Sequence, residues 1–293
     1  MGFVDYVQAI IDGLLFGTTY SLIGIGFTLV FGVMHKINMS YAAASLAGAY
    51  CGLIGPQMLG LPLWSVFPLS IVAAGVIGYV IYLTCFRFIP LASPLATLMS
   101  TVGMLLLVDE IVVHATAGMP QNYPAIYDGD PIELGPFILR ADLLGVFLIC
   151  VVAMAVLLAL LYRTRLGMAT RAVAQQPVAA QLCGMRLQAV NGLTFVVAGL
   201  LGGVAGAMIG ASVGMLSPLI AGTITVKGLI VTVIGGLGSI PGAIVAGLLV
   251  GAAENLFQAV RNVTERDIYV MLLLFAFLVL RPGGLFAAAR GRD

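Results

Sequence analysis

Long runs without a single charged residue dominate this sequence and set the strongest limit on its fold. The runs cover residues 13–34, 37–86, 88–108, 143–162, 187–226, 228–253 and 268–280. A helix that crosses a bilayer needs about 20 mostly apolar residues, and most of these runs provide them. Charged residues make up only 9% of the chain, against roughly 25% in soluble domains. The sequence therefore indicates an integral membrane protein and excludes soluble enzymes, nucleic-acid binders and secreted disulfide scaffolds.

The runs divide further where turn-forming residues gather. Residues 55–62 contain Gly-Pro and Leu-Pro pairs, which split the run 37–86 into two spans. Ser217-Pro218 interrupts the glycine-rich run 187–226 in the same way. We predict an all-α polytopic membrane protein, a single transmembrane domain over 1–293, with about eight to nine transmembrane helices, some broken or re-entrant. Residues 222–235 either cross the membrane or re-enter it.

The few charges predict the orientation. The loop 163–189 carries four arginines and no acidic residue, so it is expected to be cytoplasmic by the positive-inside rule. The loop 118–141 is acidic and is expected to be extracytoplasmic. The N-terminus carries the acidic Asp5 and Asp12 and is expected outside. The C-terminus is expected inside, because it carries Arg281, Arg290 and Arg292.

Two glycine-rich clusters predict breaks in the helices at or near membrane depth. They cover residues 32–38 and 235–242. Non-helical backbone at that depth requires satisfaction by protein or by a water-filled cavity, and transporters use such breaks to contact substrate. The candidate substrate-pathway residues are Asn38, Tyr41, Gly235, Gly236, Gly238 and Ser239.

The apolar runs also contain regularly spaced glycines and a few ionisable residues. Glycines at 202, 206, 210 and 214, with 199 and 203 beside them, predict a face for close helix packing. Ionisable residues such as Asp12, Lys227 and Glu254 either mark a pathway or a pair, or lie near the interfaces, where long side chains reach water.

The sequence lacks the common catalytic motifs. It contains no phosphate-binding Gly-rich loop, no HExxH and no GxSxG pattern. The four cysteines are scattered singly and fit apolar packing better than metal binding. We therefore expect no catalytic residue, no metal and no cofactor on this chain. A stand-alone channel or secondary transporter, and a membrane-embedded enzyme, are the alternatives to an importer subunit.

The segment 165–185 is too polar to span the membrane and predicts two short helices divided at Gln176-Pro177. Proline suits the first turn of the second helix, and Gly184 suits its end. Such a pair could be a docking site for a soluble partner or simply a cytoplasmic loop.

With its flanking residues, this segment resembles the coupling loop of branched-chain amino-acid ABC importer permeases of the LivH type. Residues 235–242 (Gly-Gly-Leu-Gly-Ser-Ile-Pro-Gly), 281–286 and the stretch from Tyr20 to Asn38 are similar to the same family, over nearly the whole chain. The resemblance implies that ATPase coupling falls on Arg165, Gly167, Arg171, Ala172, Gln176, Pro177, Ala180 and Gly184.

The resemblance also implies partners. These are a second permease subunit, identical or homologous, two ATP-binding cassette subunits that hold ATP and Mg, and an extracytoplasmic solute-binding protein, in a bacterial-type inner membrane. The expected cargo is a small polar organic solute, either a branched-chain or other amino acid or an amide-like compound. At residues 39–43 the chain has Met-Ser-Tyr-Ala-Ala where the family usually has an aromatic, a small residue and His-Gly-Glu.

Overall fold

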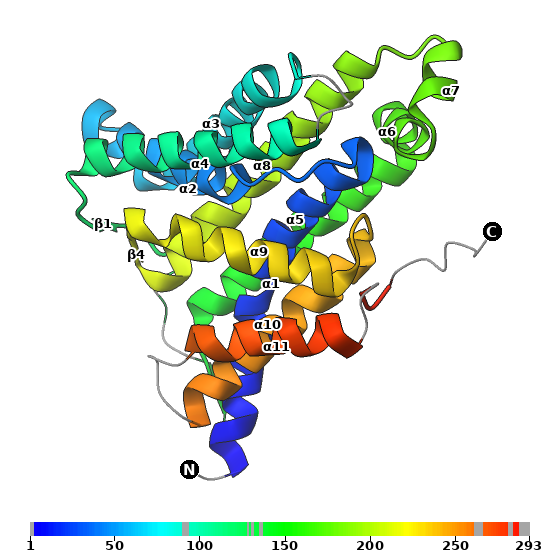
Figure 1. The fold of residues 1–293 in the computed structure, drawn as a ribbon. Helices are drawn as coiled ribbons and strands as arrows, with labels where there is room; N and C mark the ends of the chain where they lie inside the picture. Colours follow the sequence, from blue (N-terminus) through cyan, green and yellow to red (C-terminus); the bar gives the residue numbers. More distant parts are fainter. Residues whose placement is uncertain are drawn as a thin grey trace.

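The protein is an all-α polytopic membrane protein in the computed structural model, which describes residues 3–89, 94–127, 129, 132–134, 137–260, 266–280 and 284–286 (Figure 1). The helices are α1 (Phe3–Met34), α2 (Tyr41–Leu59), α3 (Val66–Ile81), α4 (Pro94–Thr116), α5 (Ala141–Arg163), α6 (Arg165–Gln175), α7 (Pro177–Leu182), α8 (Leu187–Val213), α9 (Ala221–Gly235), α10 (Ile240–Val260) and α11 (Arg266–Leu280). Short 3₁₀ turns precede α3 and α9, and a π-helical turn (Tyr82–Phe86) follows α3. Asp128, Asp130, Arg281, Arg290 and Arg292, on which the predicted orientation partly rests, lie outside the described residues.

Seven segments in the described part of the chain are long and apolar enough to cross a membrane. They contain α1, α3, α4, α5, α8, α9 and α10. The segment Pro218–Gly235 is one of these by length and composition, which fits a crossing by residues 222–235 as well as a re-entrant helix. The remaining helices of the predicted set are α2, which contains Pro56, and α11, whose apolar part is only Ile268–Phe277.

One predicted span is displaced. The charge-free run 88–108 predicted the fourth span, but α4 begins at Pro94 and continues to Thr116 through Asp109 and Glu110. Proline suits a helix start because its missing N–H would have no partner there. The two acids lie in the last turns of α4, and Glu110 is exposed there, beside His114. Charged side chains cost little near the end of a membrane helix, where they reach the interface, and much at the bilayer centre.

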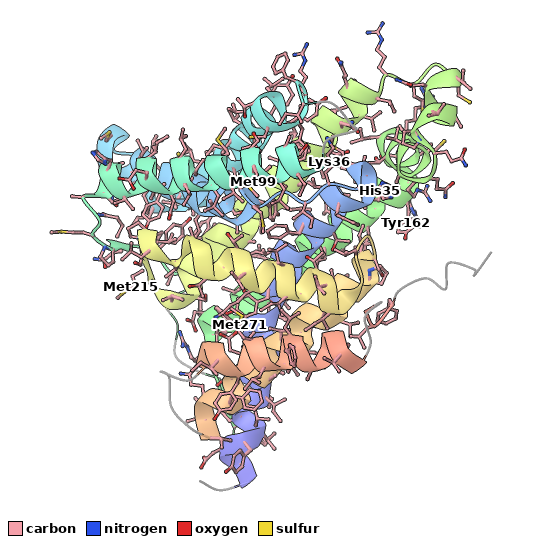
Figure 2. All side chains as sticks on the ribbon, viewed as in Figure 1. His35, Lys36, Met99, Tyr162, Met215 and Met271 are labelled. Carbon is pink, nitrogen blue, oxygen red and sulfur yellow. The ribbon has the colours of Figure 1, made fainter. Side chains whose placement is uncertain are left out.

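The molecule has two ends, which we call the loop end and the helix-pair end. At the loop end, the Gln8 side chain bonds the backbone of Ile138, and β1 (Gln121–Asn122) pairs with β4 (Met215–Leu216). The helix-pair end carries α6 and α7 and the connection after α1. Figure 1 shows β1 and β4 on the left and α6 and α7 at the upper right, with Met215 and Tyr162 marking these sides in Figure 2. Which end faces outside stays the charge-based prediction.

The loop end is closed by the segment between α4 and α5. A second hairpin, β2 (Ile132–Leu134) and β3 (Phe137–Leu139), is antiparallel. Before it, the buried Tyr123 donates its N–H to Gly214 and shares a 3.0 Å hydroxyl contact with Ser70. Burial raises the pKa of Tyr123 to about 12, so the phenol is neutral and ties this segment to α3 and α8.

Helices α1 and α8 form the interior. In the most apolar stretch of α1, 83% of the residues are buried, and in α8 72%, against 11% in α4. A Cβ on Gly17 of α1 would lie 2.8 Å from the Gly247 carbonyl oxygen of α10, so these helices approach closely only because both positions lack side chains. The predicted packing face of α8 is confirmed, since Gly203 lies against Ile71 of α3 and Gly206 against Ser45 of α2.

Candidate functional site

The first break, predicted at residues 32–38, covers residues 35–40 in the structure because α1 continues to Met34, and buried polar side chains close it. The Asn38 Oδ1 atom accepts hydrogen bonds from the Ser40 N–H at 3.2 Å and the Ser40 hydroxyl at 2.7 Å. The connection is joined to α4 at two points, by Lys36 Nζ to Thr97 Oγ1 at 2.9 Å and by the Met39 N–H to Thr101 Oγ1. Side chains thus replace the missing helical hydrogen bonds, as buried backbone requires.

The structure places Tyr41 in the interior of the subunit, directly after this break. Its hydroxyl donates to the Ala198 carbonyl of α8 at 3.1 Å, and its ring packs edge-on against Phe27 of α1 at 5.1 Å. Tyr41 is therefore a packing contact between α1, α2 and α8. The two cavities described below are lined by other residues, so the predicted pathway role of Tyr41 and Asn38 stays a prediction.

The second break, predicted at residues 235–242, covers only residues 236–239 because α9 continues to Gly235 and α10 begins at Ile240, and it consists of backbone turns. Gly236 and Gly238 have φ angles of 98° and 89°, in the left-handed region that glycine adopts without steric cost. Ser239 caps α10, because its hydroxyl accepts a hydrogen bond from the Gly242 N–H at 3.2 Å. Gly235 packs directly against Gly242, where a Cβ would lie 2.5 Å from the backbone carbon.

The structure brings the two breaks together at the helix-pair end. A Cβ on Gly32 would have as its nearest neighbour the Gly238 Cα, at 3.6 Å. The chain near the C-terminus packs on the same place, since the Leu285 N–H donates to the Ile234 carbonyl at 2.8 Å. Of the predicted pathway residues, Asn38, Tyr41, Gly235 and Gly236 are buried, Ser239 is half-buried and Gly238 is exposed.

The predicted division of residues 165–185 into two helices is confirmed by α6 and α7. Thr164 caps α6 by accepting a hydrogen bond from the Gly167 N–H at 3.2 Å. Gly167 is buried against the backbone of Leu160 and Leu161, which leaves no space for a side chain. Arg171 is exposed and its guanidinium lies 5.1 Å from the centre of the Tyr162 ring.

Helix α7 has the predicted boundaries. Pro177 occupies its first turn, and Gly184 follows it with a φ angle of 84°. Ala180 is buried in a small cluster with Val33 of α1, Val173 of α6 and Val190 of α8. The residues implied in coupling therefore divide by exposure: Gly167 and Ala180 are buried, Ala172 is half-buried, and Arg165, Arg171, Gln176, Pro177 and Gly184 are exposed.

The helix pair α6 and α7 also has exposed apolar side chains, which were not among the residues predicted from the sequence. Met168, Val178 and Leu182 are exposed, Leu182 by 86%. Large apolar side chains exposed on an otherwise polar helix pair are typical of an interaction site. A partial signal was available, because these residues are the ones that do not fit the buried face of an otherwise polar, amphipathic segment.

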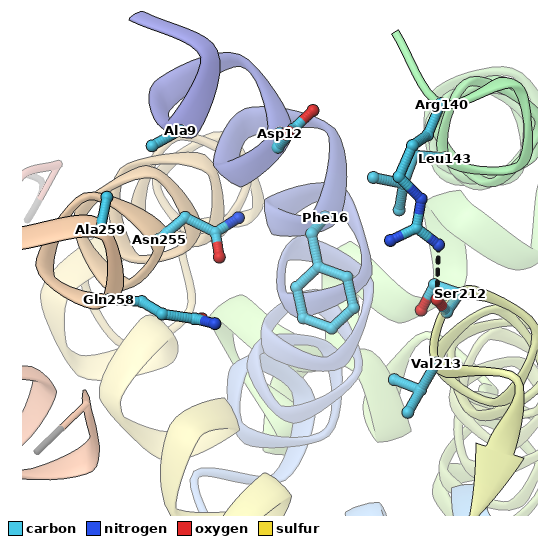
Figure 3. A pocket seen from close by; sticks show the side chains of 10 residues that line it. All are labelled: Ala9, Asp12, Phe16, Arg140, Leu143, Ser212, Val213, Asn255, Gln258 and Ala259. Atoms are coloured by element: carbon cyan, nitrogen blue, oxygen red, sulfur yellow. Dashed lines mark hydrogen bonds between the residues drawn. The ribbon is translucent and has the colours of Figure 1, made fainter. Parts of the chain in front are cut away.

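A polar cavity of about 570 Å³ opens at the loop end, between α1, α5, α8 and α10 (Figure 3). Asp12 and Phe16 project from α1, Asn255 and Gln258 project from α10, and Arg140 directly precedes α5. Asp12 accepts hydrogen bonds from the Gln8 amide at 3.1 Å. Arg140 pairs with Asp142 at 2.5 Å and donates to the Ser212 carbonyl. The cavity thus presents both signs of charge.

A buried ion pair joins α9 to α10. Lys227 Nζ lies 2.6 Å from Glu254 Oε1, and the Glu254 side chain is only 1% exposed. The sequence left these residues open between an interface position and a pair, and the structure shows the pair. Their separation in the sequence hid the contact.

Comparison with known proteins identifies the family. The model of the family described as "Branched-chain amino acid transport system / permease component" matches residues 9–280. The permease protein BraD of the high-affinity branched-chain amino acid transport system of Pseudomonas aeruginosa is 29% identical, with 96% of this chain and 95% of BraD covered. The permease protein LivH of Salmonella typhimurium is 28% identical, with 97% and 96% covered.

The fold is also similar to solved ABC transporter structures. An inward-facing metal-chelate type transporter aligns with a TM-score of 0.50 at 15% identity, over 94% of this chain and 87% of that one. PsaBC from Streptococcus pneumoniae aligns with the same score at 17% identity, over 93% and 89%. The match of the family model over most of the chain is decisive, and the chain belongs to the family of permease components of branched-chain amino acid transport systems.

Proposed function

We propose that this permease subunit imports branched-chain amino acids as part of an ABC importer. Its partners are a second permease subunit, two ATP-binding subunits, which hold ATP and Mg, and an extracytoplasmic binding protein. The complex lies in a bacterial-type inner membrane, with α6 and α7 on the cytoplasmic side. The names of the full-length relatives support the solute.

The observation that carries this proposal is the attachment of the helix pair to α1. Val173 of α6 and Ala180 of α7 pack on Val33, the residue after Gly32. Gly32 in turn lies against Gly238 in the second break. A movement of α6 and α7 is therefore passed to the point where the two breaks meet, because packed interiors transmit displacement.

In this mechanism the ATP-binding subunits bind the exposed apolar surface of Met168, Val178 and Leu182, with Arg171 beside it. Their closure on ATP moves the helix pair, and the end of α1 moves with it. The second break then changes its backbone conformation, which opens or closes the solute route at the helix-pair end. Chemistry on ATP takes place in the partners, and this chain supplies the route.

The departure from the family pattern at residues 39–43 does not argue against an amino acid. Tyr41 faces Ala198 and Phe27 inside the subunit. A change at this position is therefore a change of packing between α2 and α8.

Co-purification of the ATP-binding subunits tests the docking surface. Leu182→Asp places a carboxylate in the apolar surface and is expected to abolish co-purification and ATP-dependent leucine uptake in proteoliposomes. Met119→Asp is the matched control, because Met119 is 66% exposed but lies in the segment 118–141 at the loop end. Normal assembly of the Leu182→Asp protein would contradict the proposal.

The same preparation separates the alternatives. A stand-alone channel or secondary transporter would give gradient-driven leucine flux with this chain alone in liposomes. A membrane-embedded enzyme would convert its substrate without the partners. We expect neither, and uptake only with all subunits and ATP.

A further inference from the structure

The buried pair of Lys227 and Glu254 borders a second cavity, which lies between α9 and α11. Its volume is about 290 Å³, and its lining includes Val226, Lys227 and Ile230 from α9, and Val270 and Met271 from α11. Pockets for small molecules begin at about 300 Å³ and combine apolar walls with few polar groups. The cavity lies just below this lower limit in volume, and its walls are apolar apart from Lys227 and Thr223.

The pair is poorly explained by stability. Moving two charges out of water costs several kcal/mol per ion, and a buried pair replaced by apolar residues is often as stable or more so. Ionisable groups within membrane segments are therefore associated with function by default. The position of Lys227 on the cavity wall adds a location for that function.

We infer that this cavity is a solute site, in which the Lys227 ammonium binds the carboxylate of an apolar α-amino acid and the side chain lies on Val226, Ile230, Val270 and Met271. An ammonium has three N–H donors, so Lys227 can bond a solute carboxylate in addition to Glu254. Glu254, 2.6 Å from Nζ, holds the lysine side chain in place on the cavity wall. The Tyr20 ring, 5.7 Å from Nζ, supports the same cation from α1.

The cavity lies where a solute that enters at the loop end would bind before it reaches the second break. Gly222, Val226 and Lys227 lie in the first turns of α9, and Val270 and Met271 in the first turns of α11. Helix α9 begins beside β4 at the loop end and finishes at the second break. A solute bound here lies on the helix that leads to Gly236 and Gly238. The inference rests on the proposed function, since it names the amino acid as the solute of this site.

Filling the cavity without touching the charges is the first test. Met271→Trp places an indole in the cavity, whereas Leu272→Trp changes the next residue of α11, which does not line it. Their exposed fractions are similar, 45% and 55%. In the complete complex, Met271→Trp is expected to lower leucine uptake at least tenfold and Leu272→Trp less than twofold.

A charge exchange separates solute binding from structural support. The double variant Lys227→Glu with Glu254→Lys keeps an ion pair between α9 and α10 but puts a carboxylate on the cavity wall. We expect it to assemble, as judged by size-exclusion chromatography, and to lose leucine uptake. In the purified wild-type complex without binding protein, L-leucine is expected to raise the melting temperature and leucinamide, which lacks the carboxylate, is not.

The outcomes distinguish two failures. If the wild-type complex takes up no leucine, the proposed function and this site are both wrong. If the wild type transports leucine but Met271→Trp, or an assembled charge-exchange variant, does so at the wild-type rate, only the site is wrong. If the charge-exchange variant does not assemble, the Met271→Trp and Leu272→Trp pair decides alone.

Discussion

The two breaks in the membrane helices satisfy their backbones in different ways. Residues 35–40 use side chains, with Asn38 and Ser40 bonded to each other and Lys36 bonded to Thr97 of α4. Residues 236–239 use backbone turns at Gly236 and Gly238, and Ser239 caps the next helix. Lys36, Asn38 and Ser40 of the first break are buried, whereas Leu237 in the second is 49% exposed.

This difference separates a fixed part from a moving part. A buried network holds one conformation, because any rearrangement leaves polar groups without partners. Glycines in turns have several accessible backbone conformations. We therefore assign anchoring of α2 to the first break and the conformational change to the second, and the predictions below are directed at this assignment.

The largest loss of stability is expected from Asn38→Ala. Removal of Oδ1 leaves the Ser40 N–H and hydroxyl without their acceptor in a buried place. Each buried unsatisfied group costs about 1–3 kcal/mol, so we expect a loss of about 2–4 kcal/mol. A thermal melt of the purified complex measures it. The comparison variant Ser40→Ala removes one of the two donors and should lose less, and equal melting of both with the wild type would show that the first break is not an anchor.

A smaller loss of stability, with a larger loss of transport, is expected from Gly238→Ala. A Cβ here meets only the Gly32 Cα at 3.8 Å, so space is sufficient and the cost is the φ angle of 89°. That cost is about 1–2 kcal/mol. We expect a modest drop in melting temperature but at least a fivefold slower uptake. Gly238→Asn, which tolerates this conformation better, should recover part of the rate. Transport at the wild-type rate by Gly238→Ala would contradict the assignment of the conformational change to the second break.

The smallest effect is expected from Ser239→Ala. The lost cap of α10 costs about 1 kcal/mol, and Ser239→Asn, which also caps helices, should restore it. Ser239→Leu, by contrast, places a bulky apolar side chain in the predicted pathway and is expected to block uptake while assembly is kept. If Ser239→Leu transports normally, Ser239 is only a cap and does not belong to the pathway.

Local signals account for what could be predicted. Charge-free runs indicated the spans, and Pro177 and Gly184 marked the ends of α7 because their backbone preferences act within a few residues. The span was predicted to end before Asp109 and Glu110, but α4 continues through both. The sequence does not show where a helix end reaches the interface, where charged side chains are tolerated.

Contacts between distant segments could not be predicted. The bond from Tyr41 to Ala198 and the pair of Lys227 with Glu254 depend on how α2, α8, α9 and α10 pack. The pathway residues were chosen for their place in breaks, which identifies irregular backbone but not whether a side chain faces a cavity. The exposed apolar surface of α6 and α7 could not be predicted from the sequence alone, because which apolar side chains stay exposed depends on how these helices pack on α1 and α8.

The most direct test of coupling is the ratio of leucine imported to ATP hydrolysed by the complete complex with Val33→Ala. Val33 is the buried α1 residue in the contact with the helix pair, and the substitution shortens it without touching the surface for the ATP-binding subunits. We predict that ATP hydrolysis persists while uptake falls at least tenfold, so the ratio collapses. An unchanged ratio, with uptake and hydrolysis either both retained or both reduced alike, would contradict the transmission of movement from α6 and α7 through α1.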